Sequence, residues 1–120
     1  MTAGMVLLVL GAGGLAAVAR YGVAVLFGGT RFPFAVLVVN VIGSALGGVV
    51  LGLAERAAID PDWRLVLLTG VAGGLTTFST WSVESVQLVQ EGRRRTTALS
   101  VTLNLVLGLT AAIVGYLVTR

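Results

Sequence analysis

A long apolar segment of this chain is interrupted at its centre by two adjacent glycines and a run of hydroxyl residues. The interruption lies in residues 70–82, which read GVAGGLTTFSTWS, and the flanking residues are apolar enough to cross a bilayer. Glycine pairs and successive Ser or Thr side chains loosen a helix. Non-helical backbone at membrane depth is tolerated only where protein buries it or where it lines a wet cavity. The segment therefore predicts a membrane helix broken at its centre, an arrangement from which many transport proteins build an ion site.

Composition places the rest of the chain in the membrane as well. Hydrophobic residues make up 57% of the 120 residues and charged residues only 11%, whereas about a quarter of the residues in a soluble domain are charged. Four spans of roughly 20 residues with short connections use the whole length. We expect one all-α, multi-pass domain in the cell inner (plasma) membrane. Its helices should cover about 4–27, 33–54, 65–90 and 96–118, with the third broken near 73–77.

Several function classes are excluded by what the chain lacks. It has no Cys and no His, which removes disulfides, thiolate metal sites and the commonest proton shuttle. Its net charge is +3, but no basic face interleaved with aromatic residues exists to bind nucleic acid. Residues 11–16 match a dinucleotide-binding turn, yet no acidic residue precedes Glu55 to hold a ribose. With no nucleophile–base pair or phosphate loop, we do not expect an enzyme.

The distribution of Arg gives a weak topology signal. With four spans, one side of the membrane holds three Arg residues and the other four, or five if Arg20 inside the first span is included. The positive-inside rule hardly fixes an orientation from such a balance. A chain that inserts both ways can assemble as an antiparallel dimer, and four thin helices do not easily enclose a polar pathway alone. On charge alone, a single orientation with a weak signal is an equal alternative.

Two polar side chains lie within the first two spans. Arg20 is inside the first, where a charge costs at least about 2.5–3.5 kcal/mol on insertion scales. It could attract an anion into a vestibule, or it could snorkel or bind loop carbonyls. Asn40 could form a hydrogen bond between helices, worth roughly 0.6 kcal/mol on average in membranes, or it could donate its amide N–H groups to an anion. These alternatives stay open.

The aromatic residues after the interruption give a sharper signal. Phe78 and Trp81 are three residues apart and should share one face of the second half of the helix, while Thr76 and Thr80 should share another. Aromatic rings have a positive edge, so they can contact an anion while excluding water. The alternative is that the two rings only pack, but glycines, hydroxyls and rings gathered at one depth favour an anion site.

Glu84 supports a competing hypothesis. A single acidic residue in a small four-span protein often indicates proton-coupled export, here of cationic compounds. That mechanism normally needs the carboxylate at mid-membrane, whereas Glu84 lies near the end of the third span. We therefore expect it at an interface or in a vestibule, and the exporter remains the alternative function.

Three stretches resemble a known family. Residues 73–81, GGLTTFSTW, preceded by Gly70, closely resemble the G-G-x-T-T-F-S-T-F signature of the Fluc (CrcB) fluoride channels. Residues 11–21, GAGGLAAVARY, resemble that family's first-helix pattern, and residues 39–44, VNVIGS, its second-helix pattern. Length and four-span layout agree too, so the resemblance extends over nearly the whole chain.

The resemblance implies a passive channel through which fluoride leaves the cytoplasm, so that its toxicity falls. The family assembles as a dual-topology antiparallel homodimer with two anion pores. The resemblance further implies a structural sodium ion held at the dimer centre by backbone carbonyls, which by motif position would belong to Gly73 and Thr76.

The resemblance also implies which side chains line the pores. Stripping fluoride of water costs on the order of tens of kcal/mol by a Born estimate, so replacement partners are needed. The implied partners are the ring edges of Phe78 and Trp81, the amide of Asn40, and the hydroxyls of Ser79 and Thr80. In the fourth span, Ser100 and Asn104 are the nearest candidates for a polar track beside the pore. Position 81 departs from the pattern, because the family usually has Phe where this chain has Trp.

Overall fold

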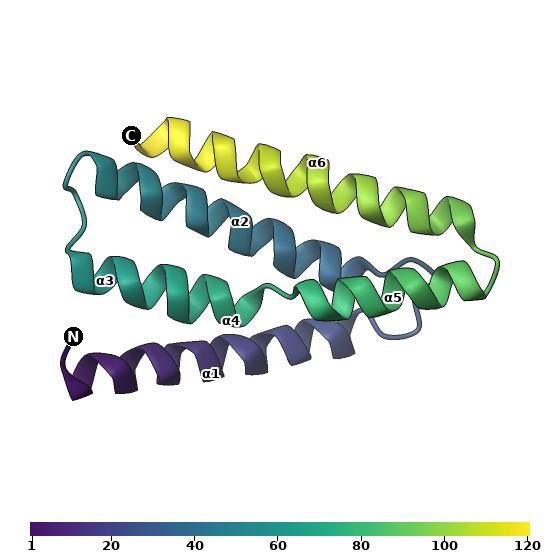
Figure 1. Cartoon of the computed structure of the whole chain (residues 1–120), viewed down its shortest axis with the longest axis horizontal. Coiled ribbons are helices and arrows are strands. Elements are labelled where there is room, and N and C mark those ends of the chain that lie inside the picture. The colour runs from purple at the N-terminus through teal and green to yellow at the C-terminus, as the bar shows by residue number, and fades with distance from the viewer.

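The chain folds into four antiparallel helical rods, described by a computed structural model of all 120 residues (Figure 1). The first two rods are α1 (Ala3–Leu26) and α2 (Phe34–Glu55). The third is assembled from four pieces, which are α3 (Pro61–Leu65), the π-helical η1 (Val66–Ala72), α4 (Gly73–Leu75) and α5 (Phe78–Gln90). The last is α6 (Arg94–Thr119).

All four rods are long and apolar enough to cross a membrane. The longest dimension, 48 Å, is comparable to a whole bilayer with its headgroups, about 40–45 Å. The prediction of an all-α, multi-pass membrane protein is therefore confirmed. Helix α2 is the central rod, because seven of its residues are buried, whereas α1 buries one and α6 three.

The contact between α2 and α6 depends on glycines. The two helices lie side by side along their length (Figure 1). A Cβ atom at Gly48 would overlap the backbone of Ala112, and one at Gly115 would lie only 2.8 Å from the carbonyl oxygen of Ala45. In lipid, where hydrophobic burial does not drive helices together, such close backbone approach provides the packing energy.

Replacing Gly48 by Ala should therefore destabilise the protein. The new methyl group meets backbone rather than a flexible side chain. We therefore expect the free energy of unfolding to fall by at least roughly 1–3 kcal/mol, the usual cost of overpacking. Thermal denaturation in detergent measures the effect. Gly11→Ala is the matched control, since a Cβ there meets no atom within 4 Å. Equal stability of the two variants would contradict this account of the helix contact.

The break in the third rod lies after the glycine pair, not at it. Gly73 keeps helical angles (φ −64°, ψ −38°), whereas Thr76 and Thr77 are extended, with ψ 156° and 120°. A Cβ at Gly74 would overlap the backbone of Gly13 on α1, so Gly74 serves close helix packing. The expected break near 73–77 is present, but the assignment of the interruption to Gly73 and Gly74 is wrong.

Candidate functional site

The side chain of Asn40 on α2 holds the broken backbone. Its Oδ1 accepts a hydrogen bond from the N–H of Thr77 at 2.8 Å, and its Nδ2 donates to the carbonyl oxygen of the same residue at 3.1 Å. Thr77 is only 6% exposed, so no water replaces these bonds. A side-chain amide thus pairs with one extended residue in both directions, as a neighbouring backbone strand would.

A second amide fixes the orientation of the first. Asn40 Nδ2 also donates to Asn104 Oδ1 at 3.2 Å, and Asn104 Nδ2 donates to the carbonyl oxygen of Ser100 at 2.8 Å. Both hydrogens of the Asn40 amide are therefore engaged within the chain. Asn104 and Ser100 are buried, and Ser100 contributes its backbone to this network. That Asn40 also contacts an anion stays a prediction.

The hydroxyl of Thr77 begins the next helix. Its Oγ1 accepts from the N–H of Thr80 at 3.2 Å and donates to Thr80 Oγ1 at 3.0 Å, while Ser79 Oγ lies 3.4 Å away. This is the N-cap arrangement for which Thr is one of the favoured residues. Thr77 was not among the site residues expected from the sequence, although a Thr directly before an apolar helix start is a usable N-cap signal.

Four backbone carbonyls, those of residues 73–76, lose their helical donors at the break, and Gly73 and Thr76 are the first and last of them. In an uninterrupted helix, the N–H of Thr77 would donate to Gly73 and that of Thr80 to Thr76. These N–H groups bind the side chains of Asn40 and Thr77 instead. The chain has no group of three or more His, Cys, Asp or Glu residues that could hold a metal ion. Neutral carbonyl oxygens are suitable ligands for a hard cation, so Gly73 and Thr76 fit the predicted sodium site.

Two aromatic rings lie beside the break. The ring centroids of Phe78 and Trp81 are 5.6 Å apart with an interplanar angle of 73°, an edge-to-face pair on one helix face, as their spacing predicts. Phe78 is 75% exposed. The rings border an open groove of about 290 Å³, which we call the polar groove. It is lined by Asn40, Ser44, Thr76, Thr77, Phe78, Trp81, Asn104 and Leu105.

Thr80 lies on the other side of α5. Together with Arg20 and Glu84 it lines a cavity of about 250 Å³ between α1, α2 and α5. The expectation that Thr76 and Thr80 share a helix face is wrong, because Thr76 is extended and borders the polar groove. Ser79 lines neither space. The structure thus groups Asn40, Thr76, Phe78, Trp81 and Asn104, and separates them from Arg20 and Thr80.

Comparison with known proteins identifies the family. A family model described as "CrcB-like protein, Camphor Resistance (CrcB)" matches residues 7–116. The chain belongs to the CrcB family. Relatives named "Fluoride-specific ion channel FluC" include one from Shewanella amazonensis, 43% identical over 92% of this chain and 91% of the relative. Another, from Renibacterium salmoninarum, is 47% identical over 71% of this chain and 68% of the relative. The resemblance seen in the sequence is confirmed, and CrcB proteins are channels rather than enzymes.

In this CrcB chain, Glu84 faces away from the polar groove. It lines both the cavity beside Arg20 and a second cavity of about 300 Å³ toward the α1–α2 loop. Its Oε2 is buried without a hydrogen-bond partner. We expected Glu84 at an interface or in a vestibule, and cavities on the α1 side of α5 are compatible with that position.

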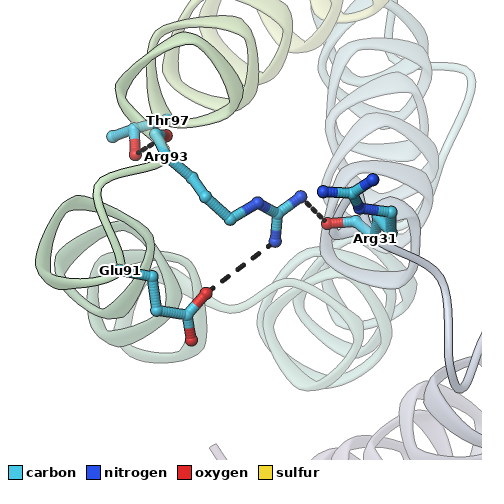
Figure 2. Close-up of polar contacts among 4 residues, drawn as sticks. All are labelled: Arg31, Glu91, Arg93 and Thr97. Atoms are coloured by element: carbon cyan, nitrogen blue, oxygen red, sulfur yellow. Dashed lines mark hydrogen bonds and ion pairs between the residues drawn. The ribbon is translucent and has the colours of Figure 1, made fainter.

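Arg93 joins the loops at the end of the CrcB bundle where α5 finishes. Figure 2 shows its guanidinium between two segments, with Nη2 donating to the carbonyl oxygen of Arg31 at 2.5 Å and Nη1 lying 3.9 Å from Glu91 Oε2. Thr97 donates its hydroxyl to the Arg93 carbonyl at 3.0 Å. The α1–α2 loop is thereby tied to the turn between α5 and α6.

Proposed function

We propose that this protein is a fluoride-selective passive channel of the cell inner membrane that exports fluoride from the cytoplasm and so lowers its toxicity. The observation that carries the proposal is the polar groove. It combines a broken helix, an edge-to-face pair of Phe78 and Trp81, and the amides of Asn40 and Asn104 at one place. Ring edges, together with amide N–H groups that are not engaged within the chain, can replace part of the hydration shell of a small anion. Relatives that bear the fluoride-channel name support the choice of ion.

We propose an antiparallel homodimer as the working unit. The polar groove is open along one side, and Phe78 on its wall is 75% exposed. If lipid lay against the amide and hydroxyl groups of this groove, their hydrogen bonds would be unsatisfied. We therefore expect a second copy of the chain to cover the groove. The near-equal number of Arg residues on the two sides permits insertion in both orientations.

A sodium ion is the proposed structural cofactor of this dimer. Gly73 and Thr76 of two antiparallel chains would present four carbonyl oxygens around one axis. When bound, the cation would neutralise the partial charges of these oxygens and hold the two breaks together, without taking part in transport.

Flux measurements on purified protein in liposomes test the function. Fluoride, chloride and organic-cation efflux should be compared with and without a proton gradient. We expect fluoride efflux that needs no gradient, with chloride efflux far slower, and we expect Glu84→Gln to keep fluoride flux. Equal fluoride and chloride rates would overturn the proposal. Cation export that requires both a gradient and Glu84 would instead establish the proton-coupled exporter.

Replacing Trp81 by Phe tests the departure from the family signature. The ring edge remains, so selectivity for fluoride over chloride should persist while the conduction rate changes. Stability should not fall through lost hydrogen bonding, because the indole Nε1–H is buried without an acceptor. Anion-selective efflux and thermal denaturation measure the two outcomes. Loss of transport in a folded Trp81→Phe protein would show that the indole N–H has an essential role.

A further inference from the structure

We propose that Asn40 and Thr77 are the positioning residues of the cation site, because their side chains keep the carbonyl oxygens of Gly73 and Thr76 free. This inference rests on the proposed sodium site and adds to it the residues that create it. It also gives Asn40 a role separable from contact with the anion.

The side chain of Asn40 takes over the helical donor of the Gly73 carbonyl. Its helical donor would be the N–H of Thr77, which instead donates to Asn40 Oδ1 at 2.8 Å. Since Thr77 is 6% exposed, its N–H needs a protein partner in either arrangement. Without the Asn40 oxygen, the nearest remedy is to extend the helix by one residue and close the N–H onto Gly73. The oxygen would then be less available to a cation.

The hydroxyl of Thr77 takes over the helical donor of the Thr76 carbonyl. Its helical donor would be the N–H of Thr80, which donates to Thr77 Oγ1 at 3.2 Å. The same hydroxyl donates to Thr80 Oγ1 at 3.0 Å, which fixes its acceptor lone pairs toward the backbone. The side chains of Asn40 and Thr77 thus serve as hydrogen-bond acceptors in place of the two carbonyls that would accept these N–H groups in a continuous helix.

Hydrogen bonds within the chain fix the orientation of the Asn40 amide. Its Nδ2 hydrogens are divided between the carbonyl of Thr77 at 3.1 Å and Asn104 Oδ1 at 3.2 Å. Asn104 is itself fixed by its bond to Ser100. These bonds point Asn40 Oδ1 toward the N–H of Thr77. The amide therefore holds the extended conformation of the backbone at the break, whether or not an anion is bound.

Sodium-dependent thermal stabilisation of the purified protein tests the proposal. Asn40→Leu and Thr77→Val remove the substituting oxygens at similar size, and we expect the sodium concentration for half-maximal stabilisation to rise at least tenfold. Thr77→Ser keeps the hydroxyl oxygen in place and should keep the sodium response. Thr97→Val is the control, since the Thr97 hydroxyl binds the Arg93 carbonyl away from the break.

The outcomes separate this inference from the proposed function. An unchanged sodium response in Asn40→Leu and Thr77→Val would overturn the positioning role while leaving the channel intact. A wild-type protein that sodium does not stabilise would overturn the cation site itself, and fluoride efflux would still be measured independently.

Amide hydrogen exchange on the wild-type chain gives a second measurement if the Leu and Val variants do not fold. We expect the N–H groups of Thr77 and Thr80 to be at least as protected with sodium as without it, because their acceptors are side-chain oxygens and sodium stabilises the folded state. Exchange that becomes faster when sodium binds would mean that these groups had been bonded to the carbonyls, and would overturn the proposal.

Discussion

Replacing Phe78 by Ile is expected to leave the protein folded and to reduce fluoride flux about 100-fold, equivalent to about 2.7 kcal/mol in the barrier. Phe78 is 75% exposed in the single chain, so little intrachain packing is lost. The substitution keeps apolar bulk but removes the positive ring edge and the edge-to-face partner of Trp81. Fluoride efflux from liposomes measures the change, and size-exclusion chromatography with thermal denaturation reports the fold.

Phe32→Ile is the matched control for this substitution. The Phe32 ring packs at a tilt against Phe34, the first residue of α2, with centroids 4.8 Å apart, and lies outside the polar groove. The same chemical change there should leave fluoride flux unaltered. If Phe78→Ile conducts as well as Phe32→Ile, the Phe78 ring only packs, and the groove is not the anion pathway.

Removing sodium is expected to abolish fluoride flux and to lower the melting temperature. A ligand that binds only the folded state stabilises it by about 2.7 kcal/mol at 100 times its dissociation constant. Without the cation, the carbonyls of Gly73 and Thr76 would meet their counterparts from the partner chain with nothing between them. Replacing sodium by N-methylglucamine in both flux and melting experiments makes the measurement.

Potassium provides the matched condition for that experiment, because it has the same charge at a larger radius. Stabilisation by sodium but not by potassium would indicate a site of fixed size. Full activity in the absence of both ions would contradict a structural cation, and the carbonyls would then need another explanation.

The sequence predicted four long apolar helices, because their hydrophobicity is readable along the chain. The break was assigned to the wrong residues because its position depends on contacts with other helices, which local sequence preferences do not include. Gly costs about 1 kcal/mol relative to Ala in a helix, so Gly73 and Gly74 were the obvious weak point. That stretch is nevertheless helical, and Gly74 packs closely against Gly13 on α1. The chain leaves the helix at Thr76 instead, where an amide 37 residues before Thr77 binds the backbone of Thr77.

The same cause explains the mixed outcome for individual site residues. Phe78 and Trp81 lie within one regular helix, so spacing placed them on one face correctly. Thr76 and Thr80 lie on opposite sides of the break, where the helical period no longer relates them. A periodicity argument holds only inside one continuous helix, and its limits depend on tertiary partners such as Asn40.

The two ends of α5 are both anchored. At its start Thr77 is bound by Asn40 and caps the helix, and just beyond its end Arg93 binds the α1–α2 loop through the carbonyl of Arg31. A half-helix without a free end cannot swing between inward-facing and outward-facing positions. Alternating access, in which one bundle rocks against another, would require these anchors to break in every cycle. In the proposed channel, ions that pass Phe78 and Trp81 would therefore encounter a wall of constant shape, and discrimination between anions would come from the chemistry of that wall.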